Sequence, residues 1–533
     1  MAERSKVQQV ADALAAAGVR QLYGLLGNGN VDLVADATAR HGTRYIASRH
    51  EAGAVAMADG HYRATGEVAV CTTTQGPGLT NAATALVTAA RAGSGVLLIV
   101  GDPAGSAMRT NQRLDHARFV EATGARFINV GVRDDWAAAT RRALAAARTG
   151  TVVLNLPVAG MALPATPDSS ATPPVAESPA VVIDGGAVAE AARLLAGAER
   201  PLLLAGRGAV PARDPLIRLA EASGAALVTS LAAKNLFGEH PHHLGFIGGM
   251  GAARANAAAA GADVAVVFGA SLTPWTTERG SLLNQAVVVH CDRNPGAAAS
   301  VPVDLPVPGD AAALAEALLS RLPAGGAAAA GWWPAAVDQP AERDYATADG
   351  GLHPAAVVDW FDRVLPAERT VVVDGGHFIA FALPRLRVPD PRGSMLTLDF
   401  GSIGLGLPTA IGAAIARPDR QCLLAVGDGG FLMALPELDT AVRERVPLLA
   451  LVLNDQAYGA EYHHLARRGE PTEISTFDSR SIAEIAAAVG AGTTRITSPA
   501  ELAALDPQRF AGLDRPHVVE ACITRAVAAP SRH

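Results

Sequence analysis

Apolar and polar positions along the chain follow the pattern of strands separated by amphipathic helices. In the first third, short apolar runs alternate with longer stretches in which small apolar residues recur every three or four positions. Strands separated by helical stretches are typical of βαβ units and of a parallel sheet. The segments expected to form these helices and strands are Lys6–Ala17, Gln21–Leu26, Val31–Ala39, Tyr45–Ala47, Glu51–Thr65, Val68–Thr74, Asn81–Ala90, Val96–Val100 and Thr151–Leu156.

The same pattern occurs twice more along the chain. Strands are expected in the middle third at Pro201–Leu204, Ala226–Val228, Val264–Phe268 and Val287–Cys291, and in the last third at Thr370–Val373, Cys422–Val426, Leu448–Leu453 and His517–Ala521. A Pro-, Ser- and Thr-rich stretch at 161–180 and an Ala- and Gly-rich stretch at 322–346 have the composition of linkers. The chain is therefore predicted to be of the α/β class, with three doubly wound parallel-sheet domains at residues 1–165, 180–322 and 347–533.

Composition narrows the classes of function. Half of the 533 residues are hydrophobic and only 4% are aromatic, which favours large aliphatic interiors. The net charge of −7 argues against a nucleic-acid partner. The four cysteines lie in or near apolar runs without paired metal-ligand spacing, as in a reduced cytosolic protein. The charged N-terminus is no signal peptide, and no apolar run reaches the ~18 residues that a membrane span needs. We therefore expect a cytoplasmic protein without a membrane partner.

Polar residues gather where two apolar runs of the last third end. Gly427–Asp428–Gly429 follows one run, and Asp455 lies just after the next. If the two strands are parallel neighbours, both carboxylates lie at the sheet edge where α/β proteins bind ligands. Glycines there let backbone N–H groups approach a phosphate, and Mg²⁺ is usually held by one or two carboxylates plus phosphate oxygens. Asp-Gly is also a common turn dipeptide, so the motif by itself leaves a plain turn open.

Gly427–Asp428–Gly429, with Asn454 at the next strand end, resembles the diphosphate- and metal-binding signature of thiamine-diphosphate-dependent enzymes. The sequence is similar to the superfamily of acetolactate synthase, benzoylformate decarboxylase and pyruvate decarboxylase over nearly its whole length. The resemblance implies a first domain that binds the aminopyrimidine, a structural middle domain and a last domain that binds the diphosphate. It also implies Mg²⁺ held by Asp428, Asp455 and the main-chain carbonyl of Ala457, although Asp455 replaces the family's second Asn.

Glu51 begins a helix of small residues, Glu51–Thr65. Acidic residues favour the first turn of any helix, which leaves a purely local role open. The segment around it, HEAGAVAMADGHYRATG, resembles the family's catalytic glutamate segment. The implied role is to share a proton with N1′ of the aminopyrimidine, which a carboxyl group with a raised pKa can do near neutral pH.

Further loops resemble family motifs at the cofactor and the substrate. Thr74–Asn81 resembles the loop at the pyrimidine end, although a tight turn is an alternative, and Thr74 stands where benzoylformate decarboxylase has a catalytic His. Asn28 takes the position that usually faces the substrate; it can form hydrogen bonds but cannot act as an acid. His377 lies in the loop expected at the diphosphate, where proton transfer, phosphate binding and a structural role are all open. The residues that the resemblance assigns to the cofactor are Glu51, Gly76, Asn81, Gly376, His377, Ile403, Gly427, Asp428, Gly429, Gly430 and Tyr458.

Two residues are expected to act on the reacting part of the cofactor. Ile403 precedes the run Gly404–Pro408 and matches the bulky residue that holds the cofactor in a V shape, a role that is compatible with ordinary core packing. Glu461 stands where pyruvate decarboxylases have a glutamate that handles the carboxylate and a later protonation. A solvated helical glutamate paired with Arg467 or Arg468 is the alternative. The candidate catalytic residues are Glu51, Glu461, His377 and Asn28.

The resemblance implies a thiamine-diphosphate- and Mg²⁺-dependent lyase or carboligase of the non-oxidative decarboxylase type that acts on a 2-oxo acid. An acetolactate synthase-like reaction is the main alternative, and a phosphate- or nucleotide-binding α/β protein without catalysis is a remote one. The middle domain contains no FAD motif that can be named, which argues against FAD but does not exclude it. In the family, the glutamate and the metal site of one active centre come from different subunits, so a homodimer or homotetramer is expected.

Overall fold

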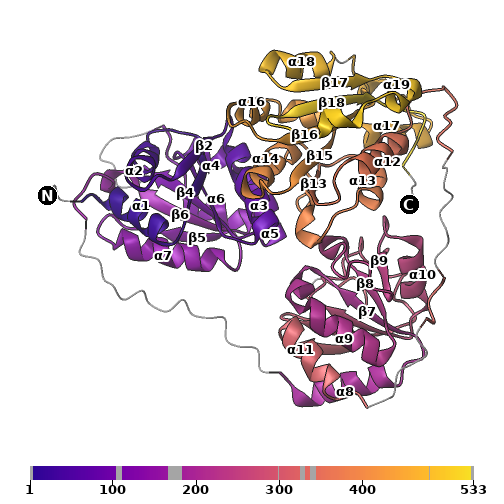
Figure 1. Cartoon of the computed structure of the whole chain (residues 1–533). Coiled ribbons are helices and arrows are strands. Elements are labelled where there is room, and N and C mark those ends of the chain that lie inside the picture. The colour runs from indigo at the N-terminus through magenta and orange to yellow at the C-terminus, as the bar shows by residue number, and fades with distance from the viewer. Residues whose placement is uncertain are drawn as a thin grey trace. The chain divides into compact units, whose positions relative to one another are not determined.

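The structure is a computed structural model that describes residues 4–103, 111–165, 183–297, 299–323, 331–335, 344–478 and 480–529. Most of the first predicted linker, 161–180, and much of the second, 322–346, lie outside the described residues. The described part contains three six-stranded sheets, each with its own helices (Figure 1). The predicted α/β class with three parallel sheets is therefore confirmed, whereas the exact domain boundaries stay a prediction.

The first sheet has the strand order β2-β1-β3-β4-β6-β5, and all its pairs are parallel. Its strands are β1 (Gln21–Gly24), β2 (Arg44–Ala47), β3 (Ala69–Thr73), β4 (Val96–Asp102), β5 (Arg126–Asn129) and β6 (Val152–Pro157). Its helices are α1 (Lys6–Ala16), α2 (Val31–His41), α3 (Glu51–Thr65), α4 (Pro77–Asn81), α5 (Ala83–Ala92), α6 (His116–Thr123) and α7 (Trp136–Ala147). Separate apolar cores fill its two faces, as expected for a doubly wound sheet.

The second sheet has the order β12-β11-β10-β7-β8-β9 and is also parallel. Its strands are β7 (Pro201–Ala205), β8 (Ala226–Thr229), β9 (His243–Phe246), β10 (Val264–Phe268), β11 (Val287–Asp292) and β12 (Leu305–Pro308). Its helices are α8 (Gly185–Ala196), α9 (Arg213–Ser223), α10 (Ala253–Gly261) and α11 (Ala311–Leu319). Apolar cores again lie on both faces.

The third sheet has the order β14-β13-β15-β16-β18-β17, with parallel pairs from β13 to β17. Its strands are β13 (Arg369–Val373), β14 (Ser394–Leu396), β15 (Gln421–Gly427), β16 (Leu448–Asn454), β17 (Gly492–Ile496) and β18 (His517–Cys522). Its helices are α12 (Pro354–Val364), α13 (Ile379–Arg385), α14 (Gly406–Ala416), α15 (Asp428–Met433), α16 (Pro436–Arg443), α17 (Gly459–Arg467), α18 (Ile482–Val489) and α19 (Pro499–Ala503).

The strands that the apolar pattern did not predict are all short edge strands. They are β5, β9, β12, β14 and β17, and each ends a sheet on one side. An edge strand is partly exposed, so it lacks the continuous apolar run by which a central parallel strand can be recognised. For example, every residue of β16 is buried, whereas no residue of β5 is.

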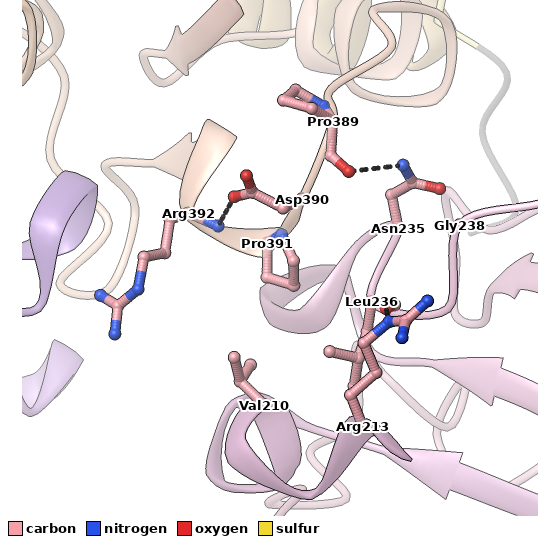
Figure 2. A pocket seen from close by; sticks show the side chains of 9 residues that line it. All are labelled: Val210, Arg213, Asn235, Leu236, Gly238, Pro389, Asp390, Pro391 and Arg392. Atoms are coloured by element: carbon pink, nitrogen blue, oxygen red, sulfur yellow. Dashed lines mark hydrogen bonds between the residues drawn. The ribbon is translucent and has the colours of Figure 1, made fainter. Parts of the chain in front are cut away.

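The described chain forms two compact units. Residues 1–176, 345–382 and 395–529 form the first unit, which contains the first and third sheets; residues 177–344 and 383–394 contribute to the second. The segment 383–394 thus lies against the second sheet's unit, and the Asn235 side chain donates to the Pro389 carbonyl at 3.1 Å (Figure 2). Among the described residues, no helix combines the length and the apolar content that crossing a bilayer requires.

Helices α3 and α14 join the first and third sheets through backbone contact. A Cβ atom on Gly60 would lie 2.0 Å from the Thr409 carbonyl oxygen, and one on Gly412 would lie 1.9 Å from the Met57 carbonyl oxygen. Apolar side chains of both helices belong to one buried core. The two glycines therefore allow the helix that begins with Glu51 to pack directly on the third sheet's domain.

Because this contact leaves no room for a methyl group, Gly60→Ala should destabilise the first unit by about 1–3 kcal/mol, as overpacking of a core does. Gly261→Ala in α10 of the second unit is the control, since, apart from its own helix and chain neighbours, no atom lies within 4 Å of its Cβ position. Denaturant unfolding of the two variants measures the difference. Equal stability of both variants would contradict the close packing of α3 on α14.

Candidate active site

Asp428 and Asp455 lie at the carboxyl ends of adjacent parallel strands. Strands β15 and β16 pair in parallel, so the ends of both predicted runs lie at the same sheet edge. Both side chains are buried, and one carboxylate oxygen of each, Oδ2, has no hydrogen-bond partner within the described residues. Burial raises the pKa of Asp428 to about 6, and burial together with the charge of Asp428 raises the pKa of Asp455 to about 7. The effect of the Asp428 charge on Asp455 agrees with the sequence prediction that the two carboxylates lie close together.

A tight turn after β16 presents the backbone of Ala457. Gln456 adopts φ = 55°, the left-handed region, and its N–H donates to the Asn454 side chain at 3.0 Å. Ala457 N–H donates to Asp455 Oδ1 at 3.1 Å. Ala457 forms an isolated antiparallel bridge with Thr476. In this bridge the Tyr458 N–H donates to the Ser475 carbonyl and the Phe477 N–H donates to the Gln456 carbonyl, so the Ala457 carbonyl takes no part.

This donor set fits a hard divalent cation. Two buried carboxylate oxygens accept no hydrogen bond from the described residues, and a backbone carbonyl lies in the turn beside them. Oxygen ligands are those that Mg²⁺ prefers. The described residues contain no cluster of three or more His, Cys, Asp or Glu side chains suited to a metal. A cation held here would therefore need further oxygens from a backbone carbonyl, a phosphate or water.

Glycines bring the neighbouring predicted residues into close contact. A Cβ on Gly429 would lie 2.8 Å from the Tyr458 ring, and one on Gly430 would lie 2.7 Å from an Asp374 carboxylate oxygen. The Tyr458 ring is half-exposed and packs edge-on against Phe477, with ring centroids 4.7 Å apart. Gly427 ends β15, and Asp428 begins α15 directly after it.

Asp374 fixes the loop that carries Ile403. Its carboxylate is fully buried and accepts from the Gly404 N–H at 2.8 Å and from the Thr397 hydroxyl at 3.0 Å. Burial raises its pKa above the ordinary aspartate value. Ile403 packs over Gly375, where a Cβ would lie 2.7 Å from its Cγ2, yet it stays partly exposed. Sequence reasoning missed this anchoring role of Asp374, although the residue lies directly after a buried strand and begins the loop that resembles the family's diphosphate loop.

His377 lies beside the Asp428–Asp455 pair and is held neutral. Its Nδ1 is 3.7 Å from Asp455 Oδ2, and its ring lies 5.2 Å from the His463 ring. Burial, followed by the neighbouring His463, lowers the pKa of His377 to about 4. A neutral imidazole serves as a hydrogen-bond donor and acceptor rather than as a cation for phosphate. Gly376, just before it, adopts φ = 147°, which favours glycine.

Glu51 and the predicted pyrimidine-end loop meet at the head of α3. Glu51 is buried and accepts a hydrogen bond from the Asn81 side chain at 3.0 Å. Gly76 adopts φ = 60°, and a Cβ there would lie 2.4 Å from the Gln112 carbonyl oxygen. Within the described residues of the single chain, no hydrogen bond or ion pair joins Glu51 to Asp428 or Asp455.

Asn28 and Glu461 are both exposed in the single chain. The apolar surroundings that the sequence suggested for Glu461 are therefore not supplied by the described residues of this chain. The alternative ion pair is also not formed with Arg468, which bonds to Glu470 at 2.8 Å instead. Glu461 lies in the first turn of α17, three residues after Tyr458.

Family comparisons agree with this arrangement. Models of the thiamine pyrophosphate enzymes match residues 5–119 as the N-terminal TPP binding domain, residues 188–318 as the central domain and residues 374–521 as the C-terminal TPP binding domain. Together these matches span most of the chain, and the chain belongs to the thiamine pyrophosphate enzyme family.

Relatives within the family carry different names. The chain is 30% identical to a sulfoacetaldehyde acetyltransferase of Alcaligenes xylosoxydans xylosoxydans, with 97% of this chain and 92% of the relative covered. It is 28% identical to the acetolactate synthase isozyme 3 large subunit of Escherichia coli K12, with 93% and 91% covered. A crystal structure of benzoylformate decarboxylase from Polynucleobacter necessarius superposes with a TM-score of 0.82 at 20% identity, covering 99% of this chain and 100% of that one. At that identity the structural likeness supports the fold alone.

Asp428→Ala should abolish Mg²⁺-dependent binding of thiamine diphosphate, because the cation loses a carboxylate ligand beside the diphosphate. Asp455→Asn should have a milder effect, because an amide oxygen remains at the site. Calorimetric titration with and without Mg²⁺ measures both. Asp419→Ala, which removes an exposed aspartate paired with Arg417, is the control and should bind like the wild type. Wild-type affinity in Asp428→Ala would place the metal elsewhere.

Proposed function

We propose that this protein is a thiamine-diphosphate- and Mg²⁺-dependent C–C lyase or carboligase that acts on a 2-oxo acid. Membership of the family supports the cofactor, and the buried carboxylate pair at the ends of β15 and β16 supports the cation. The observation that carries catalysis, rather than binding alone, is Glu51. It is buried and bonded to Asn81 in the N-terminal TPP binding domain, and a protein that merely bound the cofactor would not need it.

Each proposed residue has a separate task. When bound, thiamine diphosphate supplies the carbon nucleophile and the electron sink for loss of CO₂. Glu51, oriented by Asn81, holds a proton at N1′ of the aminopyrimidine. Asp428, Asp455 and the Ala457 carbonyl hold Mg²⁺. Ile403 supports the cofactor from its place over Gly375.

His377 and Glu461 are proposed to act on the substrate side. His377 is largely buried and neutral, so it can donate or accept one hydrogen bond near the reacting carbon. Glu461 is the proposed proton donor for aldehyde release. Because it is exposed in the single chain, this role requires a second subunit that covers α17. Asn28, also exposed, is proposed to bind substrate through its amide.

A homodimer or homotetramer with the active site at a subunit interface agrees with these positions. Several large apolar side chains of the first unit are exposed in the described single chain. These side chains are Leu26, Phe400, Met433, Tyr458, Ile474 and Phe477. We therefore propose that a second copy covers this surface and supplies the other half of each site.

Transfer of the reacting fragment to a second carbonyl compound is the second candidate, as in an acetolactate synthase. The relative named acetolactate synthase favours it. The two candidates differ in product. A screen of 2-oxo acids with thiamine diphosphate and Mg²⁺ should release CO₂ in either case, and product analysis by NMR separates an aldehyde from a coupled product. No CO₂ from any 2-oxo acid, with the cofactor bound, would contradict both candidates.

Glu51→Gln should keep cofactor affinity near the wild-type value but slow exchange of the thiazolium C2 proton by about 10²–10⁴-fold, as loss of a positioned acid–base group does. Acid quench of the cofactor-loaded enzyme in D₂O, followed by NMR, measures the exchange. An unchanged exchange rate would remove Glu51 from its proposed role.

Glu461→Gln should keep shape and hydrogen bonding but lose the transferable proton. We expect about one CO₂ per site in the first turnover and strongly slowed release of aldehyde, as measured by rapid quench. Glu470→Gln, on the same segment but paired with Arg468, should behave like the wild type. If Glu461→Gln also releases aldehyde at the wild-type rate, Glu461 is a surface glutamate and the coupling reaction gains support.

A further inference from the structure

Helix α16 holds the short segment that leads into Glu51. The Arg443 side chain donates to the Ala47 carbonyl at 2.6 Å, and the Arg49 side chain bonds to Asp439 at 2.6 Å. A further ion pair joins Arg44 to Glu444 at 2.7 Å. Residues 44–50 of the first sheet's domain are thus bound along one helix of the third sheet's domain, within the same compact unit.

At the centre of this contact lies the buried carboxylate of Glu437. Its Oε1 accepts the backbone N–H of Arg49 at 3.0 Å and that of His50 at 2.9 Å, and its Oε2 accepts the Thr440 hydroxyl at 2.9 Å. Only 3% of Glu437 is exposed. A carboxylate with these three donors fixes the backbone direction of the two residues that precede Glu51.

The first turn of α3 is shaped to receive this carboxylate. A Cβ on Gly53 would lie 2.0 Å from Glu437 Oε1 and 2.6 Å from its Cδ. Gly53 is therefore needed for space, and Glu437 rests directly against the turn that contains Glu51. His50 is the N-cap that precedes this turn, and its Nδ1 accepts the Ala52 N–H at 3.1 Å.

The negative charge of Glu437 is favourable at the N-terminus of α3, because a helix N-terminus has unpaired N–H groups and the positive end of the helix dipole. The bonds to Asp439 and Glu444 are made by partly exposed side chains, and they involve no backbone N–H of this turn. Of these contacts, only that of Glu437 combines burial with direct bonds to the backbone next to Glu51.

We infer that Glu437 is a positioning residue that sets the location of Glu51 for proton transfer at the aminopyrimidine. This inference rests on the proposed role of Glu51. Glu437 acts through the backbone of residues 49–50 and the first turn of α3. A displacement of about 1 Å at a reacting group can cost about 100-fold in rate, so loss of Glu437 should slow proton transfer without removing Glu51.

The first test compares Glu437→Ala with Glu437→Gln. The amide oxygen of glutamine can still accept both backbone N–H groups, and its NH₂ can donate to the Thr440 hydroxyl, so Glu437→Gln should rescue the wild-type behaviour. Glu437→Ala should slow exchange of the C2 proton by about 10–100-fold while cofactor affinity changes little. Equal exchange rates in Glu437→Ala and the wild type would overturn the inference.

The second test needs no cofactor. Amide hydrogen exchange, followed by mass spectrometry, should be faster in peptides that cover residues 48–54 of Glu437→Ala than of the wild type, and unchanged in Glu437→Gln. Glu444→Ala is the matched control, because it removes an ion pair between the C-cap of the same helix and the same segment but no backbone bond. If Glu444→Ala increases exchange as much as Glu437→Ala, the contact is a general packing surface and the specific role of Glu437 is wrong.

Gly53→Ala provides a variant that keeps the carboxylate but displaces it, in case Glu437→Ala does not fold. Gly53→Ala should also slow exchange of the C2 proton, and a wild-type rate would contradict the inference.

The double variant Glu51→Gln with Glu437→Ala separates the role of Glu437 from the role of Glu51. Adding Glu437→Ala to Glu51→Gln should slow exchange little further, whereas a full additional loss would show that Glu437 does not act through Glu51. If Glu51→Gln alone has no effect, the proposed role of Glu51 itself fails.

Discussion

Two carboxylates buried at the ends of neighbouring parallel strands impose the main constraint on this structure. Asp428 and Asp455 lie at one edge of the third sheet, and each has a carboxylate oxygen that accepts no hydrogen bond from the described residues. Burying carboxylates is unfavourable, so burial raises the pKa of both groups, and the charge of Asp428 raises the pKa of Asp455 further. A divalent cation removes this cost. The left-handed turn at Gln456 and the close approach of Tyr458 to Gly429 place further groups around the same point.

The other half of the proposed chemistry depends on backbone contact between two domains of one unit. Helix α3 packs on α14 through Gly60 and Gly412, and its first turn is held by Glu437 of α16. Glu51 is therefore not simply the first residue of an isolated helix. Its position is set by the domain that also carries the Asp428–Asp455 pair, although the two groups do not bond within the described single chain. In the proposed oligomer, the third sheet's domain of one chain would carry the aspartate pair of one site and would position the Glu51 that serves another site.

Much of the fold could be predicted from the sequence because central parallel strands are buried on both faces and form continuous apolar runs. β15 and β16 were found in this way, and with them the adjacent aspartates. Edge strands such as β5 and β17 were missed because half-exposed strands lack that pattern. The inclusion of residues 383–394 in the second unit could not be predicted either, because it depends on contacts with Asn235 that are distant in sequence.

In the candidate site, too, residues within motifs could be predicted, whereas residues that act through contacts distant in sequence could not. Glu51 and Asn81 could be named from motifs, and the structure brings them together in one hydrogen bond. Asp374 and Glu437 could not be assigned a role, because each works through backbone N–H groups of a distant loop. Glu461 could be named from its position in a motif, but its burial could not be predicted. Its side chain is exposed in the single chain.

Anomalous diffraction from crystals grown with thiamine diphosphate and Mn²⁺ in place of Mg²⁺ tests the central claim most directly. The account predicts one strong anomalous peak per site, bonded at about 2.1 Å, a distance typical of Mg²⁺ sites, to carboxylate oxygens of Asp428 and Asp455 and to the Ala457 carbonyl, with the diphosphate beside it. A diphosphate bound elsewhere, or a cation that contacts neither aspartate, would contradict it.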